Sequence, residues 1–201
     1  MPSYKLNYFP IRGRAEIVRL VFAQAGVEYE DNRIPSELWP QYKPETPWGQ
    51  MPVLEVDGRP LGQSITIARF IARQHGLAGK DNFEQALADS IVDCLVELQN
   101  LIIRAWFEKD EATKAELLKK LQDEDVPRTL NNLERFLGSN DFFVGNQVTW
   151  ADLFFQNIGE ILLKRNVDAF SKHDKLNALY KRVESLPNIK KWLEMRPKTD
   201  I

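Results

Sequence analysis

The side chains most able to do chemistry in this sequence stand at the ends of expected strands and helices in the first third of the chain. Tyr8 closes a short alternating run, Arg14 precedes a helical pattern, and Gln63 and Ser64 stand where another helix would begin. A phenol, a guanidinium and the free N–H groups of a helix start are hydrogen-bond donors suited to an anion. Each also has an ordinary structural interpretation, such as a half-buried strand end or a helix cap.

Other common catalytic motifs are missing. The chain has no glycine-rich phosphate loop, no GxSxG elbow and no HExxH helix. Its one cysteine and two histidines cannot form a zinc site made only of His and Cys. Cys94 lies on an apolar helical stripe, which favours a buried, inert thiol. A basic cluster near the C-terminus is interpreted as a solvated helix face: Lys190, Lys191, Arg196 and Lys198.

Residues 1–78 show the pattern of a small mixed sheet with helices. Gly26 stands where a helix ends, and Asp57-Gly58 is a strong two-residue hairpin signal. Five prolines from Pro35 to Pro52 exclude a long element between them. We predict β-α-β, a loop, then β-β-α, with the opening pair of strands parallel and the closing pair antiparallel. The expected strands are at 4–8, 28–34, 53–56 and 59–61. The expected helices run from 15 to 25 and from 63 or 64 to about 74.

Residues 79–201 are expected to form an all-helical domain after a linker at 77–82. Apolar residues recur at helical spacing through this region. Pro127 should bend or interrupt the second long helix, and Pro187 should separate the last two. Thr149 and Asp152 have the spacing of a capping box at a helix start. The predicted fold class is therefore α/β plus all-α.

Composition narrows the setting of the protein. The 201 residues are 43% hydrophobic, enough for sizeable cores, and the net charge of −2 gives no reason to expect a nucleic-acid partner. One cysteine excludes an intramolecular disulfide. No leader-like start and no long apolar run are seen, so we expect a cytoplasmic protein without a membrane partner.

Taken together, these motifs resemble the glutathione S-transferase family, and within it the sigma class. The resemblance covers the whole chain and implies a thioredoxin-like N-terminal domain, an all-helical C-terminal domain, a homodimer and glutathione as cosubstrate. It is carried by Tyr4-Lys5-Leu6-Asn7-Tyr8-Phe9, Arg12-Gly13-Arg14-Ala15-Glu16, Trp39-Pro40, the run from Gly49 to Gly58, Gln63-Ser64, Val144-Gly145-Asn146, Val148-Thr149-Trp150-Ala151-Asp152 and Arg196-Pro197.

The resemblance implies a role for each matching residue. Tyr8 would be the catalytic hydroxyl, donating a hydrogen bond to the glutathione sulfur, with Arg14 supporting the thiolate. Gln63 and Ser64 would hold the γ-glutamyl carboxylate at a helix N-terminus. The remaining implied contacts are Trp39 and Lys43 with the glycyl carboxylate, Gln50 and Met51 with the cysteinyl part through a backbone turned by a cis Pro52, and Glu97 across the dimer with the amino group.

The second substrate would lie between the loop after the first strand and the end of the first long C-terminal helix. The loop side consists of Tyr8, Phe9, Arg12, Gly13 and Arg14. Trp106 forms the opposite wall if the helix carries about two extra residues before it, whereas Arg104 occupies the wall if the insertion lies elsewhere. Ordinary helix packing is the alternative for Trp106.

The resemblance leaves three functions open. We expect glutathione conjugation to hydrophobic electrophiles or reduction of peroxides; glutathione-dependent isomerisation of prostaglandin H to prostaglandin D is the alternative. A non-catalytic crystallin-like or carrier protein is a third possibility, although a structural role places no demand on Tyr8. Some members bind a divalent metal at positions matching Asp93, Val96 and Glu97, but Val96 lacks a carboxylate, so no metal is expected.

Overall fold

The computed structural model describes residues 2–165, 167 and 169–199, which divide into two compact units. The first unit combines the chain up to Leu77 with the C-terminal segment that begins at Leu186. The second is Ala78–Ser185. The C-terminal segment belongs with the first unit because its helix α9 (Pro187–Met195) packs on helix α1 (Glu16–Ala25).

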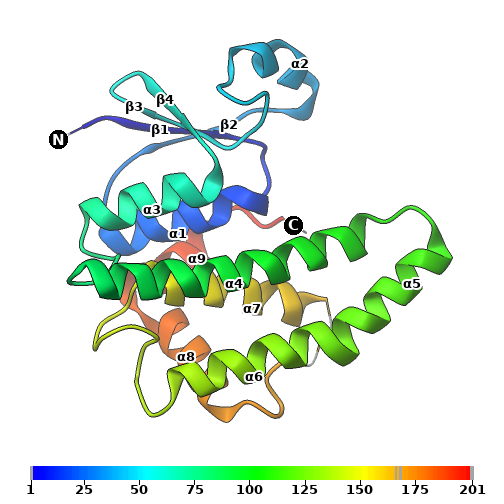
Figure 1. Ribbon diagram of the computed structural model, residues 1–201. Helices are drawn as coiled ribbons and strands as arrows, with labels where there is room; N and C mark the ends of the chain where they lie inside the picture. Colours follow the sequence, from blue (N-terminus) through cyan, green and yellow to red (C-terminus); the bar gives the residue numbers. More distant parts are fainter. Residues whose placement is uncertain (1, 166, 168, 200–201) are drawn as a thin grey trace. The chain divides into compact units, whose positions relative to one another are not determined.

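The first unit is a four-stranded sheet with helices on one face (Figure 1). The strands are β1 (Tyr4–Tyr8), β2 (Glu30–Arg33), β3 (Val53–Val56) and β4 (Arg59–Gly62), in the order β2-β1-β3-β4. β1 pairs with β2 in parallel and with β3 antiparallel, and β3 and β4 form an antiparallel hairpin. The predicted topology is confirmed. Helices α1 and α3 (Ser64–Gln74) pack against each other and cover the sheet.

Local sequence signals explain most of these boundaries. Gly26 ends α1 at φ 66°, a left-handed conformation that lacks a Cβ penalty only for glycine. Asp57 and Gly58 have φ values of 51° and 75°, as a tight hairpin turn requires. The strand expected at 28–34 was too long, because the described ladder with β1 begins at Glu30.

The proline-rich segment forms only single turns, as predicted. It contains the 3₁₀ turn η2 (Ser36–Leu38), the short helix α2 (Trp39–Tyr42) and the 3₁₀ turn η3 (Lys43–Glu45). The Met51-Pro52 bond is cis, which confirms the expectation for Pro52. This segment therefore leads from the sheet edge back to β3 without a long element of its own.

The second unit is helical throughout its regular elements. They are α4 (Asn82–Phe107), α5 (Glu111–Lys120), a π-helical turn η4 (Leu121–Asp125), α6 (Val126–Leu137), α7 (Trp150–Lys164) and α8 (Asp174–Ser185). The interruption expected near Pro127 is confirmed by η4. Among the described residues, no helix is both long enough and apolar enough to cross a membrane.

Helix α7 lies at the centre of this unit and begins at the predicted capping box. The Asp152 carboxylate is fully buried and accepts hydrogen bonds from the Thr149 N–H at 2.8 Å, the Thr149 hydroxyl at 2.9 Å and the Phe143 N–H at 2.9 Å. Burial outweighs these bonds and raises the pKa of Asp152 to about 6. One carboxylate thus joins the preceding loop to the start of the central helix.

Candidate functional site

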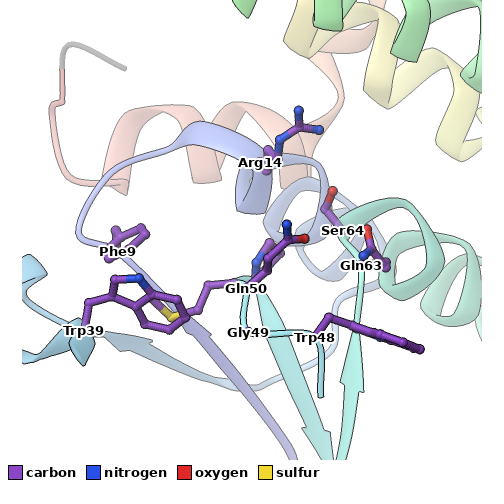
Figure 2. Close-up of a pocket in the computed structure, with 10 residues that line it drawn as sticks. Phe9, Arg14, Trp39, Trp48, Gly49, Gln50, Gln63 and Ser64 are labelled. Carbon is purple, nitrogen blue, oxygen red and sulfur yellow. The ribbon is translucent and has the colours of Figure 1, made fainter. Parts of the chain in front are cut away.

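A cavity of about 490 Å³ opens in the first unit, at the ends of its strands (Figure 2). Its walls come from the loop after β1, helix α2, the segment before β3 and the start of α3. Figure 2 shows an aromatic end at Phe9 and Trp39 and a polar end at Gln63 and Ser64, with Gln50 between them. The lining residues are Phe9, Arg14, Trp39, Trp48, Gly49, Gln50, Met51, Pro52, Gln63 and Ser64.

Tyr8 is not itself a lining residue of this cavity, but it contacts two residues that are, Phe9 and Arg14. The strand alternation buries its ring, and the backbone N–H of Arg14 donates a hydrogen bond to its hydroxyl oxygen at 3.0 Å. Because the oxygen accepts from Arg14, the hydroxyl proton remains to be donated elsewhere. Burial raises the pKa of Tyr8, against the lowering effect of the Arg14 N–H and of the charges on Arg14 and Arg19, so the phenol is neutral at physiological pH.

The polar end of the cavity is the N-terminus of α3. Gln63 precedes the helix with φ 73° and ψ 111°, and its side chain makes no capping hydrogen bond. Its carbonyl accepts from the N–H of Ile67 at 2.9 Å, which fixes the first turn. Ser64, the first residue of the helix, is buried. First-turn N–H groups left without a side-chain cap, at the positive end of a helix dipole, are a ready site for an anion.

One long wall of the cavity is the segment that enters β3. Trp48, Gly49, Gln50 and Met51 line it in sequence before the cis proline. Trp48 and Gly49 were not predicted as site residues. The signal available in the sequence was a tryptophan inside a proline-rich segment, shortly before Gln50 and Met51. In the structure its side chain is 67% exposed.

The aromatic end depends on Trp39 and Phe9, whose rings meet edge to face at 5.7 Å between centroids. Phe9 also contacts the ring of Tyr8 at 5.5 Å. Lys43 does not line the cavity. It is exposed on η3, and its Cε would lie 3.7 Å from a Cβ placed on Gly49, so its long side chain runs beside the lining segment.

The remaining predicted residues do not line this cavity. Arg12 is buried and Gly13 begins a 3₁₀ turn beside Tyr8. Glu97 and Arg104 are exposed on α4, and the ring of Trp106 lies under the Arg165 guanidinium, 4.7 Å from its carbon. These three belong to the second unit.

The two histidines and the one cysteine lie outside the cavity lining. His75, His173 and Cys94 do not line the cavity, and His173 pairs with Glu134 at 2.8 Å. Burial raises the pKa of the Cys94 thiol, which is consistent with an inert role. Among the residues that the structure describes, no group of three or more His, Cys, Asp or Glu side chains is arranged for a metal ion.

Family models match both parts of the chain. The N-terminal domain of glutathione S-transferases matches residues 4–73, and their C-terminal domain matches residues 96–196. The chain belongs to the glutathione S-transferase family. The expectations of an α/β plus all-α fold and of an enzyme with glutathione as cosubstrate are confirmed by this membership.

Individual relatives match over 99–100% of the chain. Hematopoietic prostaglandin D synthase from Gallus gallus is 46% identical over 100% of both chains. Glutathione S-transferase 1 from Ascaris suum is 45% identical over 99% of both. The solved structure of rat hPGDS complexed with a quinoline superposes with a TM-score of 0.93 at 39% identity, covering 100% of both chains. This glutathione transferase is therefore similar both to a prostaglandin synthase and to a nematode transferase.

Proposed function

We propose that this glutathione transferase binds glutathione in the cavity of its first unit and holds it as the thiolate with the Tyr8 hydroxyl, for attack on a hydrophobic electrophile or peroxide. The observation that carries this proposal is the hydrogen bond from the Arg14 N–H to the Tyr8 oxygen. That bond occupies the oxygen as an acceptor and aims its proton at a partner. A sulfur anion at the adjacent cavity wall is the partner that the family chemistry supplies.

The two ends of the cavity suit the two ends of a glutathione molecule. Gln63 and Ser64, at the start of α3, match the γ-glutamyl carboxylate, which a helix N-terminus stabilises. Trp39 matches the glycyl carboxylate at the other end, with Lys43 within reach along its side chain. Gln50, Met51 and the cis Pro52 then offer backbone to the cysteinyl part between them.

Tyr8 and Arg14 can supply the free energy needed to lower the pKa of the glutathione thiol. A free thiol has a pKa of about 8.5, and lowering it by about two units takes roughly 2.7 kcal/mol of preferential thiolate stabilisation. One hydrogen bond to a charged group contributes roughly 1.5–3 kcal/mol. The Tyr8 hydroxyl together with the positive charge of Arg14 is therefore of the right size.

We assign Phe9, Arg12 and Gly13 of the first unit to the second substrate, and we keep Trp106 and Arg104 of the second unit as the two alternative substrate contacts that the resemblance implies. The ring of Trp106 packs against the guanidinium of Arg165, which supports the alternative of ordinary packing for Trp106. Arg104 is exposed. A Trp106→Ala variant that keeps its stability but loses selectivity among hydrophobic electrophiles would favour Trp106.

A second candidate is the isomerisation of prostaglandin H to prostaglandin D. The 46% identity to hematopoietic prostaglandin D synthase from Gallus gallus favours it. The same thiolate would attack the endoperoxide and be released at the end. Feeding the endoperoxide distinguishes the two, because an isomerase yields one prostaglandin and uncatalysed breakdown yields a mixture.

The sigma class, a homodimer and a cytoplasmic location complete the proposal. In the dimer, Glu97 of one subunit would contact the amino group of glutathione in the other. Light scattering at working concentration tests this assembly, and a monomer mass would remove Glu97 from the site.

The decisive experiment is an ultraviolet titration of the glutathione thiolate bound to the wild-type protein and to Tyr8→Phe between about pH 5 and 9. We expect a lowered thiol pKa in the wild type that Tyr8→Phe loses. Tyr29→Phe is a matched control, because the Tyr29 ring is packed on Phe22 and does not line the cavity. A bound thiol that titrates like free glutathione in the wild type would instead favour the non-catalytic alternative.

A further inference from the structure

A fully buried arginine lies behind the proposed catalytic tyrosine. Arg19, on α1, has a side chain with 0% exposure, and its Nη1 donates to the carbonyl oxygens of Ile11 at 2.8 Å and Arg12 at 3.3 Å. Its Nε donates to Asp31 at 3.1 Å. A buried guanidinium is costly unless it is paired and hydrogen-bonded, so these contacts fix the positions of the groups that make them.

A second carboxylate, that of Glu16, pairs with Arg19 and also binds the C-terminal segment. Glu16 is 1% exposed and faces Arg19 Nη1 at 3.5 Å. Its other oxygen accepts from Trp192 Nε1 at 2.9 Å and from Arg196 Nη1 at 2.7 Å. The interpretation of Arg196 as part of a solvated face was therefore wrong, because its side chain is only 10% exposed and pairs with Glu16.

Arg19 binds the carbonyl oxygens of Ile11 and Arg12. These two residues belong to the turn that carries the Arg14 N–H. Ile11 and Arg12 directly precede Gly13 and Arg14, and it is the Arg14 N–H that donates to the Tyr8 oxygen. A shift of this turn would move that N–H away from the hydroxyl. The guanidinium carbon of Arg19 also lies 5.9 Å from the centre of the Tyr8 ring, within the range of a cation–π contact.

We propose that Arg19 is a positioning residue for the transferase reaction. By clamping the carbonyls of Ile11 and Arg12, it keeps the Arg14 N–H on the Tyr8 oxygen and so keeps the Tyr8 proton directed at the glutathione sulfur. Glu16, tied to Trp192 and Arg196, holds Arg19 in place and brings the C-terminal helix into this arrangement. The inference rests on the proposed function, because it concerns the same hydroxyl.

The first test is Arg19→Lys, which keeps the charge but replaces a fork of donors with a single ammonium group. We expect the pKa of bound glutathione to rise by about one unit, from about 6.5 to about 7.5. The thiolate fraction, and kcat with it, should then fall about threefold at pH 7 and about tenfold near pH 5.5. KM for glutathione should change less than about twofold, because the hydrogen bonds of Arg19 go to Ile11, Arg12, Asp31 and Glu16, none of which lines the cavity. The deficit should shrink as pH rises and the thiol ionises unaided.

A merely structural role would give a different pattern. A partly unfolded or less stable enzyme keeps the wild-type thiol pKa in the molecules that remain folded and bind glutathione. An unchanged thiol pKa in folded Arg19→Lys would therefore overturn the proposal, whatever the loss of activity.

Trp192→Phe is the milder variant, for use if Arg19→Lys does not fold. It keeps a large ring on α9 but removes the N–H that Glu16 accepts. We expect a smaller thiol pKa shift in the same direction, and a loss of kcat of about 1.5-fold at pH 7 that grows as the pH is lowered. Lys191→Gln, on the exposed side of the same helix, should match the wild type. A wild-type thiol pKa in Trp192→Phe and in any folded Arg19→Lys would overturn the proposal.

The Tyr8→Phe titration separates this proposal from the one on which it rests. If Tyr8→Phe leaves the bound thiol unchanged, the proposed function fails and this inference with it. If Tyr8→Phe raises the thiol pKa while folded Arg19→Lys does not, only the positioning role of Arg19 is lost.

Discussion

The α-carbon of Gly13 faces the hydroxyl of Tyr8 so closely that a Cβ atom there would lie 2.6 Å from the phenol oxygen. Gly13 also has φ +42°, which side chains rarely adopt. The absence of a side chain at this position is therefore what leaves room for the Tyr8 hydroxyl beside the Arg14 N–H.

Gly13→Ala should consequently reduce activity far more than stability. A methyl group must displace the Tyr8 hydroxyl, and loss of its bond to the thiolate should lower kcat/KM about 100-fold, equivalent to roughly 2.7 kcal/mol. Gly58→Ala is the matched control, since Gly58 has φ +75° but nothing within 4 Å of a Cβ. Both variants should lose about 1 kcal/mol of stability from backbone strain, and only Gly13→Ala should lose activity. Full activity in Gly13→Ala would contradict the assignment of Tyr8.

Gln63→Gly should raise stability and weaken glutathione binding at once. Gln63 has φ 73°, a strained conformation for a residue with a Cβ, whereas glycine adopts it freely. After allowing for the extra freedom of glycine in the unfolded chain, we expect a net gain of roughly 1 kcal/mol. KM for glutathione should rise about tenfold as one polar contact is lost. Gln63→Ala should show the same rise in KM without the gain in urea unfolding. An unchanged KM in both variants would remove Gln63 from the glutathione site.

Trp48→Ala should raise KM for glutathione about fivefold with little change in kcat, because Trp48 lines the cavity without contacting Tyr8. Gly62→Ala should reproduce part of this effect, since a Cβ on Gly62 would lie 2.6 Å from a ring carbon of Trp48 and displace the indole. Met195→Ala removes another side chain that is mostly exposed and should leave steady-state kinetics unchanged. A wild-type KM in Trp48→Ala would mean that the Trp48 ring does not contribute to glutathione binding.

As the pH rises from about 4 to about 6, the free energy of unfolding should fall because of Asp152. Burial raises the pKa of Asp152 to about 6, above the value of about 3.9 in an unfolded chain. The folded state therefore binds more protons in this window, and raising the pH through it removes stability. Urea unfolding at fixed protein concentration measures this slope.

Asp152→Asn should lose that slope, since an amide does not titrate. It should also lose roughly 1–3 kcal/mol at neutral pH, because its NH₂ group cannot accept from the buried donors of Thr149 and Phe143. Glu116→Gln, an exposed carboxylate on α5, should keep the wild-type slope. The same pH dependence in Asp152→Asn and wild type would show that another group titrates.

Local patterns in the sequence were sufficient for the layout of the strands and helices. Gly26, the Asp57-Gly58 turn, Pro127 and the Thr149 to Asp152 box each act over a few residues, and the structure confirms all four. Family motifs supplied most of the cavity lining in the same way, because Gln50 to Pro52 and Gln63-Ser64 are short continuous segments. Trp48 and Gly49 were missed although they adjoin a matched segment.

Contacts between distant segments were decided only by the tertiary structure. Arg196 reads as one charge among several on a helix, yet it pairs with Glu16, 180 residues away. Arg19 is charged, which by itself favours an exposed side chain, yet the fold buries it completely with its guanidinium 5.9 Å from the centre of the Tyr8 ring. The sequence determined which residues begin and end each element because those preferences are short-range. Burial of a charge depends on which surfaces the folded chain brings together, and that decided the partners of Glu16 and Arg19.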